Sequence, residues 1–134
     1  MGRDASLAAV ERFRVACDGH RLVTAAFLGG SYAAGTARED SDIDVYTVTA
    51  VEDYDAFVAE RERFMRSWGD PVRLEDVWNF EGLGFDMILF QLDDGVHGEL
   101  ALGHTENLMR IHGGPYRVLV DRAGLLDGVV FPLL

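Results

Sequence analysis

The sequence is poor in cysteine and has no long apolar run. Cys17 is the only cysteine among 134 residues, which excludes a disulfide framework and a zinc site built from paired cysteines. No apolar stretch approaches the length that crosses a membrane, and no basic segment is followed by an apolar one as in a secretion signal. We therefore expect a cytoplasmic protein with no membrane partner, in which Cys17 is a small buried residue of a helix.

Basic residues are also scarce. Lysine and arginine together number 12 against 23 acidic residues, which gives a formal net charge of −11 at pH 7, and the basic residues form no cluster. A surface that neutralises nucleic-acid phosphates needs a basic stripe. Nucleic acid is therefore not an expected partner, and a small or cationic molecule or another protein fits the charge better.

Composition and periodicity predict one α+β (α/β) domain over residues 1–134. The chain is 49% hydrophobic and 26% charged, which is ordinary for a globular protein. Apolar residues recur at helical spacing over residues 6–18 and 53–68, and residues 105–112 are expected to form a short helix. Strand patterns cover residues 21–28, 72–78, 84–92, 96–103 and 116–120. We expect a mixed sheet of about five strands, with the two longer helices on one face and a cleft on the other.

Two aspartates flank one apolar residue at the start of a further strand. Side chains alternate along a strand, so Asp42 and Asp44 point to one face while Ile43 and Val45 point into the core. Neighbouring carboxylates repel each other, and a bound divalent cation offsets that repulsion. Oxygen ligands on a rigid strand suit Mg²⁺, which keeps positions for water and substrate phosphates. Asp42 and Asp44 are therefore candidate metal ligands and catalytic residues.

A glycine turn precedes the aspartates. Gly29 and Gly30 allow the backbone to approach a ligand closely, and Ser31 is expected to begin a helix whose free N–H groups attract an anion. These three residues are candidate nucleotide-binding residues. Arg38, in the loop before the aspartates, is a fourth candidate because its charge would neutralise a phosphate.

Glu99 interrupts the apolar strand at 96–103. Alternation puts His97 and Glu99 on one face of this strand, opposite Leu100 and Leu102. A carboxylate in such a place needs a partner, because burying it alone is costly. Asp86 interrupts another apolar strand in the same way.

The glycine-serine turn, the ten residues between Ser31 and Asp42, and the Asp-x-Asp strand together resemble the DNA polymerase beta-type nucleotidyltransferases. The chain is similar to their minimal and antibiotic-modifying forms. The resemblance implies ATP or another nucleoside triphosphate as substrate, with one or two Mg²⁺ ions. It also implies transfer of a nucleoside monophosphate, most often AMP, to a hydroxyl of a small molecule or a protein, with release of pyrophosphate.

The resemblance further implies a third carboxylate on a later strand, flanked by hydrophobic residues. Glu99 is the best match for this catalytic and metal-binding acid, and Asp86 is the alternative. The four histidines are left outside the catalytic set, since a lone histidine on a strand or at a helix end is more often structural: His20, His97, His104 and His112.

The C-terminal residues 129–134 are mostly apolar and are expected to prefer a partner surface. This favours a homodimer or a helical partner domain at the C-terminus. It also supports a second hypothesis, a nucleotide-binding or partner-binding module that keeps the fold without catalysis. The three acids Asp42, Asp44 and Glu99 favour the enzyme.

Overall fold

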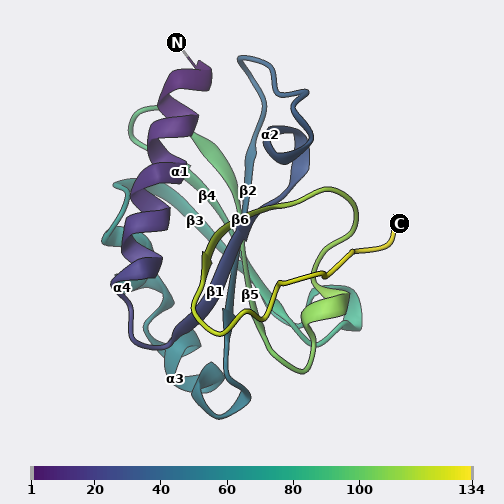
Figure 1. The fold of residues 1–134 in the computed structure, drawn as a ribbon. Coiled ribbons are helices and arrows are strands. Elements are labelled where there is room, and N and C mark those ends of the chain that lie inside the picture. Colours follow the sequence, from purple (N-terminus) through teal and green to yellow (C-terminus); the bar gives the residue numbers. More distant parts are fainter. Residues whose placement is uncertain (1, 134) are drawn as a thin grey trace.

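The computed structural model describes residues 2–133 as one mixed β-sheet with helices and a C-terminal segment packed on it (Figure 1). Within these residues six strands lie in the order β3-β4-β5-β2-β1-β6. The predicted mixed α+β fold is confirmed, and the sheet has six strands among the described residues where the sequence predicts about five. The strands are β1 (Val23–Leu28), β2 (Ile43–Thr49), β3 (Pro71–Val77), β4 (Asp86–Leu92), β5 (His97–His104) and β6 (Arg117–Asp121).

The strands β2 and β5 pair in parallel, whereas the other pairings between described strands are antiparallel. A parallel pair needs a long crossover connection, and here the chain passes through two helices and the strands β3 and β4 before it reaches β5. The strands β4 and β5 form the predicted hairpin. Its turn places Gly95 at φ +89°, a backbone conformation that glycine adopts without strain.

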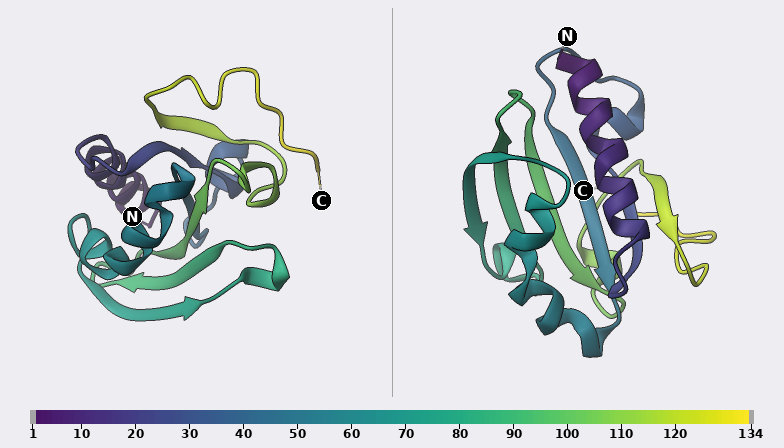
Figure 2. Two further views of the ribbon diagram at one scale, coloured as in Figure 1. Left: turned by 90° about the horizontal axis from the view of Figure 1, so that it is seen from below. Right: turned by 90° about the vertical axis from the view of Figure 1, so that its left-hand side faces the viewer.

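Three helices cover one face of the sheet: α1 (Gly2–Asp18), α3 (Tyr54–Ala59) and α4 (Arg61–Arg66) (Figures 1 and 2). This confirms the prediction that helices pack on one face. The side chains between the helices and the sheet form the larger core, in which Phe13, Leu28, Ile43 and Leu100 have no exposed surface. Cys17 is buried in the same core as expected, and burial raises the pKa of its thiol.

The periodicity predicts one helix over residues 53–68, and the structure corrects this to a short 3-10 helix, Val51–Asp53, followed by α3 and α4. The helices break at Glu60, whose backbone angles of φ −109° and ψ 18° are not helical. The Glu60 carboxylate lies 2.6 Å from Nε2 of His20. The rings of Phe57 and Phe64 both pack against the His20 ring, so a tertiary contact sets the bend that the apolar pattern does not reveal.

The predicted helix at 105–112 is also wrong, because this segment holds only a 3-10 helix, Leu108–Arg110. The buried side chain of Asn107 accepts a hydrogen bond from the amide of His104 and donates one to the carbonyl of Gly84. These bonds tie the segment to the end of β5 and to the loop before β4, and they take the place of helical hydrogen bonds. A third 3-10 helix, Phe80–Gly82, precedes β4.

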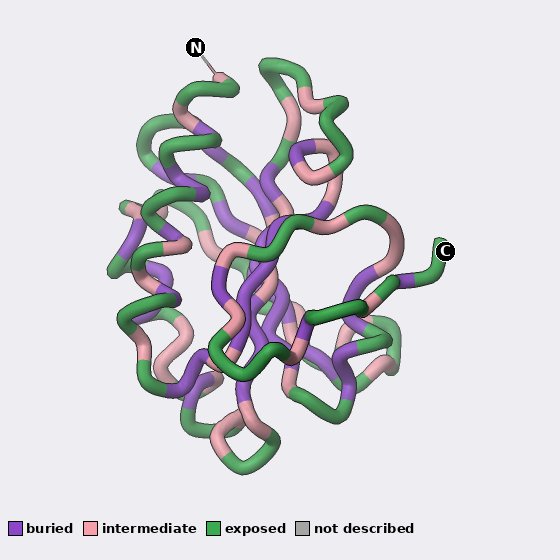
Figure 3. The backbone as a smooth tube through the Cα atoms, viewed as in Figure 1, coloured by how far each residue is buried: buried purple, intermediate pink, exposed green. Residues whose placement is uncertain are grey.

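The C-terminal segment, residues 105–133, covers part of the second face of the sheet. Phe131 is buried and stacks on Phe27 of β1 at a ring distance of 5.4 Å, and Leu126 is buried in the same cluster. The apolar tail therefore finds much of its partner surface in its own chain, although Val130 and Leu133 are exposed. Figure 3 shows buried residues along the central strands and a mixture of exposed, intermediate and buried residues along this segment.

No helix among residues 2–133 is both long enough and apolar enough to cross a membrane.

Candidate functional site

Asp44 and Glu99 stand side by side on neighbouring parallel strands. Asp44 of β2 is in register with Glu99 of β5, and side chains at matched positions of adjacent strands share a face. Asp42 directly precedes β2, and its Oδ1 lies 2.5 Å from Nδ1 of His97 on β5. The pairing of β2 with β5 therefore gathers three carboxylates and one imidazole where both strands begin, on the face away from the helices.

Like charges surround the two carboxylates that are partly buried, Asp44 and Glu99. Burial, followed by the charges of Glu99 and Asp42, raises the pKa of Asp44 to about 6. Burial and the charge of Asp42 also raise the pKa of Glu99 above its ordinary value. A cation placed among these groups would favour their charged forms and reverse both effects. The electrostatics thus favour a positively charged ligand at this point.

The glycine turn lies directly against Asp44. The amide of Gly29 donates a hydrogen bond to the carbonyl of Asp44 at 2.9 Å, and Gly30 begins the short helix α2 (Gly30–Ala34). Gly30 has φ +62°, and a Cβ added to it would lie 2.0 Å from Oδ2 of Asp44. Only glycine lets the backbone approach the carboxylate this closely. The turn is therefore packed directly against the Asp44 carboxylate.

A cleft of about 380 Å³ extends from the carboxylates across the outer strands. The strand register arranges its polar side chains in two rows. Glu75 of β3 pairs with Leu89 of β4, and Leu89 pairs with Glu99. In the second row Arg73 pairs with Gln91, and Gln91 pairs with His97, which reaches Asp42. The glycine turn, which follows β1, lies on one side of Asp44, and the cleft lies on the other side.

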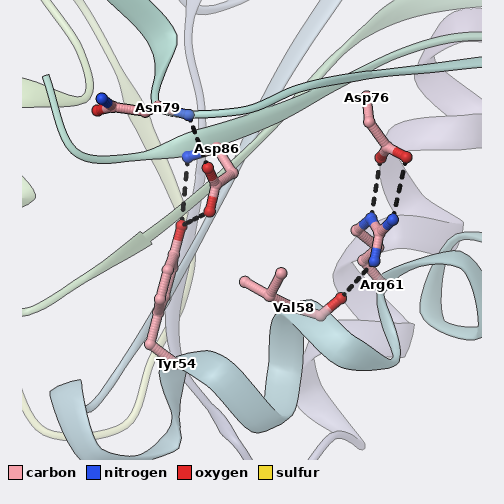
Figure 4. A network of polar contacts seen from close by, with 6 residues as sticks. All are labelled: Tyr54, Val58, Arg61, Asp76, Asn79 and Asp86. Atoms are coloured by element: carbon pink, nitrogen blue, oxygen red, sulfur yellow. Dashed lines mark hydrogen bonds and ion pairs between the residues drawn. The ribbon is translucent and has the colours of Figure 1, made fainter. Parts of the chain in front are cut away.

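Asp86, the alternative third acid, points to the other face of the sheet (Figure 4). Its carboxylate accepts hydrogen bonds from the hydroxyl of Tyr54 at 2.7 Å and from the amide of Asn79 at 2.8 Å. Figure 4 also shows the neighbouring ion pair of Arg61 with Asp76 on this face, at 2.9 Å. Asp86 thus ties a helix and a loop to β4, and Glu99 is the acid that the fold brings to Asp44.

The structure places the other predicted residues near the turn or in the adjoining loop. Ser31 lies in the first turn of α2. Arg38 is exposed in the loop between α2 and β2, where its backbone amide donates to Oγ of Ser41 at 2.8 Å.

The comparison with known families agrees with this geometry. A model of the nucleotidyltransferase domain matches residues 10–94, which is more than half of the chain. The chain belongs to this family. Its parent group is the polymerase beta-like superfamily that the glycine turn and the Asp-x-Asp strand resemble. The matched part of this nucleotidyltransferase domain includes the turn and both aspartates, whereas His97 and Glu99 lie just beyond it. A search of curated proteins found no match.

The donor atoms of the carboxylate group fit Mg²⁺ by type, since all are hard oxygens. Among residues 2–133, no three His, Cys, Asp or Glu side chains are arranged so that they alone could hold a metal ion. Mg²⁺ is usually held by one or two carboxylates together with substrate phosphates and waters, and it does not require a cage of protein ligands. Asp42 and Asp44 match that pattern, with Glu99 beside them.

Three residues at this site escape the sequence-based selection. His97 is paired with Asp42, and its place on the face of Glu99 was the available signal. Arg73 and Glu75 lie on the same face of β3. The sequence does not reveal that β3 lies two strands away from β5 in the sheet. The pattern of apolar and polar residues therefore cannot predict contacts that depend on the order of the strands in the sheet.

We predict that Gly30→Ala and Gly35→Ala have different effects on the site. Both glycines have positive φ, so each alanine should cost on the order of 1 kcal/mol of folding free energy. Only the Gly30 methyl would meet Asp44, because nothing lies within 4 Å of a Cβ at Gly35. Calorimetric titration of ATP with Mg²⁺ should show binding lost in Gly30→Ala and kept in Gly35→Ala. Equal loss in both variants would contradict the contact with Asp44.

Asp44 should make folding stability depend on pH. Its pKa in the folded protein is raised to about 6, so the folded state binds this proton more tightly than the unfolded chain. Stability from this group is therefore lost as pH rises through the window from about 4 to about 6. Asp44→Asn should stabilise the protein above this window by on the order of 1 kcal/mol, after allowance for partial exposure of the carboxylate, and should have no such effect below it.

Urea unfolding at several pH values on both sides of this window would measure the difference between Asp44→Asn and the wild type. Asp40→Asn, in the exposed loop nearby, removes the same charge without the burial and serves as the control. A constant difference between Asp44→Asn and the wild type at all pH values would contradict the raised pKa.

Proposed function

We propose that this nucleotidyltransferase domain uses Mg²⁺ to transfer a nucleoside monophosphate, AMP from ATP, to a hydroxyl of a small molecule or a protein. The observation that carries the proposal is the register of Asp44 with Glu99 beside a glycine turn that rests on Asp44. A strand-to-helix turn alone would account for the glycines. It would not account for Asp42, Asp44 and Glu99 held close together, where the charges of Glu99 and Asp42 raise the pKa of the partly buried Asp44 and the charge of Asp42 raises that of Glu99.

In this proposal the triphosphate lies against the glycine turn and beside the two aspartates. The backbone at Gly29, Gly30 and Ser31 would approach the phosphates, and Arg38 in the loop would offset part of their charge. Asp42 and Asp44 would hold Mg²⁺, as one ion or two. When bound, the metal would neutralise the phosphate oxygens and the charge that develops on the leaving group. His97 would keep the Asp42 carboxylate in place through its 2.5 Å contact.

The transfer itself exchanges one bond to phosphorus for another. The acceptor oxygen forms a bond to the α-phosphorus, the bond from that phosphorus to the bridging oxygen breaks, and pyrophosphate leaves. Glu99 would take the proton of the acceptor hydroxyl, or else complete the metal site. Glu99 lines the cleft and lies beside Asp44, so its position is compatible with either role.

The acceptor would enter from the cleft over β3, β4 and β5. This cleft reaches Glu99 from the side opposite the glycine turn, so an acceptor in it would approach Glu99 without passing the turn. Its polar groups are mixed in sign, with Arg73 and Glu75 on one strand. The cleft and the net charge of −11 favour a small molecule or a protein over a nucleic acid.

The other candidate function is nucleotide binding without transfer. Its sequence basis was the apolar tail, and Phe131 of that tail is buried against Phe27 of the same chain. The tail therefore offers less support for a partner-binding module than its composition indicates.

Binding of ATP should depend on Mg²⁺ and on both aspartates. We expect titration calorimetry to detect ATP binding with Mg²⁺ and at least about tenfold weaker binding without it, because the metal joins the phosphates to the carboxylates. The double variant Asp42→Asn/Asp44→Asn should lose the metal-dependent part. Asp86→Asn is the matched control, since it changes an acid in a neighbouring strand on the other face. Absence of binding to the wild type would overturn the proposal.

Glu99→Gln should separate the two roles proposed for Glu99. If Glu99 accepts the hydroxyl proton, the variant should bind ATP with Mg²⁺ within about threefold of the wild type and lose roughly 100-fold or more in transfer rate. If it completes the metal site, ATP affinity should fall as well. Pyrophosphate release, measured with an acceptor selected by screening hydroxyl compounds on the wild type, gives the rate. A variant with full transfer activity would exclude both roles.

A further inference from the structure

The glycine turn rests on two rings that come from other parts of the chain. A Cβ added to Gly29 would lie 2.6 Å from Cε1 of His112 and 2.8 Å from Cε1 of Tyr46. The backbone of Gly29 is therefore packed directly on both rings. Tyr46 follows Asp44 by two residues on β2, whereas His112 belongs to the C-terminal segment, beyond the part of the chain that matches the family model.

Two hydrogen bonds fix the His112 ring. Its Nε2 lies 2.8 Å from the carbonyl oxygen of Pro115, so this nitrogen carries a proton and donates it. Its Nδ1 lies 3.0 Å from the hydroxyl of Tyr46. Burial lowers the pKa of His112, which favours the neutral ring, and Nδ1 then accepts a hydrogen bond from Tyr46. The imidazole joins β2 to the loop at Pro115.

Aromatic packing fixes the Tyr46 ring as well. It stacks on Phe27 of β1 with ring centres 4.5 Å apart and planes 4° from parallel. Phe27 is fully buried and stacks in turn on Phe131 near the C-terminus. The two rings under Gly29 are thus held from both sides, by strands of the sheet and by the C-terminal segment.

We propose that the hydrogen-bonded pair of Tyr46 and His112 is a positioning unit that holds the glycine turn against Asp44 and thereby sets the affinity for the nucleotide. Neither residue needs to touch the nucleotide. The unit acts through Gly29, whose amide bonds to the Asp44 carbonyl, and through Gly30, which lies over the Asp44 carboxylate. The C-terminal segment is then part of the nucleotide site. The claim about affinity rests on the proposed function, whereas the claim about the turn does not.

The test compares two tyrosine hydroxyls of the same aromatic cluster. Tyr46→Phe removes the bond to His112 and keeps the stacking on Phe27. Tyr116→Phe is the matched control, because the Tyr116 hydroxyl bonds to the carbonyls of Leu126 and Val129 within the C-terminal segment and its ring also contacts Phe27. Tyr46→Phe loses one partly buried hydrogen bond, and Tyr116→Phe loses the single hydroxyl proton that is shared between two carbonyls, so urea unfolding should show similar losses of stability.

The amide exchange rate of Gly29, measured by NMR in the protein without ligand, reports on the turn alone. It should rise about fivefold in Tyr46→Phe and stay unchanged in Tyr116→Phe, since one lost hydrogen bond changes an equilibrium by about that factor. The affinity for ATP with Mg²⁺, measured by calorimetry, should fall by a similar factor in Tyr46→Phe only. An unchanged Gly29 exchange rate in Tyr46→Phe, or an equal rise in both variants, would overturn the proposal.

Two replacements of His112 separate its hydrogen bonds. The side-chain oxygen of His112→Asn can take the place of Nδ1 and accept from Tyr46, while the side-chain nitrogen of His112→Gln can take the place of Nε2 and donate to Pro115. If the bond to Tyr46 positions the turn, His112→Asn should keep the Gly29 exchange rate closer to that of the wild type than His112→Gln does. The reverse order would overturn the assignment to Tyr46.

The two proposals fail in different ways. If the wild type does not bind ATP with Mg²⁺, the proposed function fails, and the Gly29 exchange rate still decides whether the pair positions the turn. If the wild type binds and Tyr46→Phe changes the exchange rate without changing affinity, the pair has no influence on the nucleotide and the positioning proposal is wrong.

Discussion

The parallel pairing of β2 with β5 is the constraint on which the site depends. It places Asp44 beside Glu99 and brings His97 to Asp42, so it holds like charges together that would separate in a free chain. The unfavourable electrostatics are tolerated because the same two strands bury Ile43, Val45, Leu100 and Leu102 completely on the other face. Burial of such side chains contributes more free energy than a partly exposed carboxylate costs. The core therefore stabilises a site that is unfavourable by itself.

The two faces of the sheet have different roles, and the C-terminal segment divides the second face further. Helices cover the first face. On the second face the segment packs on β1 and β2 through Phe27, Tyr46 and Phe131 and also buries Met87 of β4, while the positions of β3, β4 and β5 that line the cleft stay open. The cleft lies over β3, β4 and β5, next to the covered area. Its position thus follows from where the C-terminal cover ends, and the carboxylates lie at that boundary.

Local patterns predict the parts of this structure whose causes are local. Alternation is sufficient to put Asp42 and Asp44 on one face, because a strand fixes its own side-chain directions. The glycine turn, the β4–β5 hairpin and the apolar faces of the helices have equally local signals. Alternation alone does not distinguish Glu99 from Asp86, because each is a single acid in an apolar strand. Only the strand pairing reveals that Glu99 faces Asp44 while Asp86 bonds to Tyr54. The helix break at Glu60 likewise depends on a residue 40 positions away, His20.

The match to the family model covers residues 10–94, which hold the turn, the aspartates, the helices α3 and α4 and the strands β3 and β4. The turn and the aspartates are close in sequence, and their spacing alone carries a recognisable pattern. Three residues that the proposals above add to them, His97, Glu99 and His112, come from later segments and meet them only through the fold. A side chain that bonds to Asp42 or packs under Gly29 can come from any segment that reaches that place. The turn and the aspartates are therefore encoded by a motif that is local in sequence, whereas the residues that meet them from later segments depend on strand pairing and on the C-terminal segment.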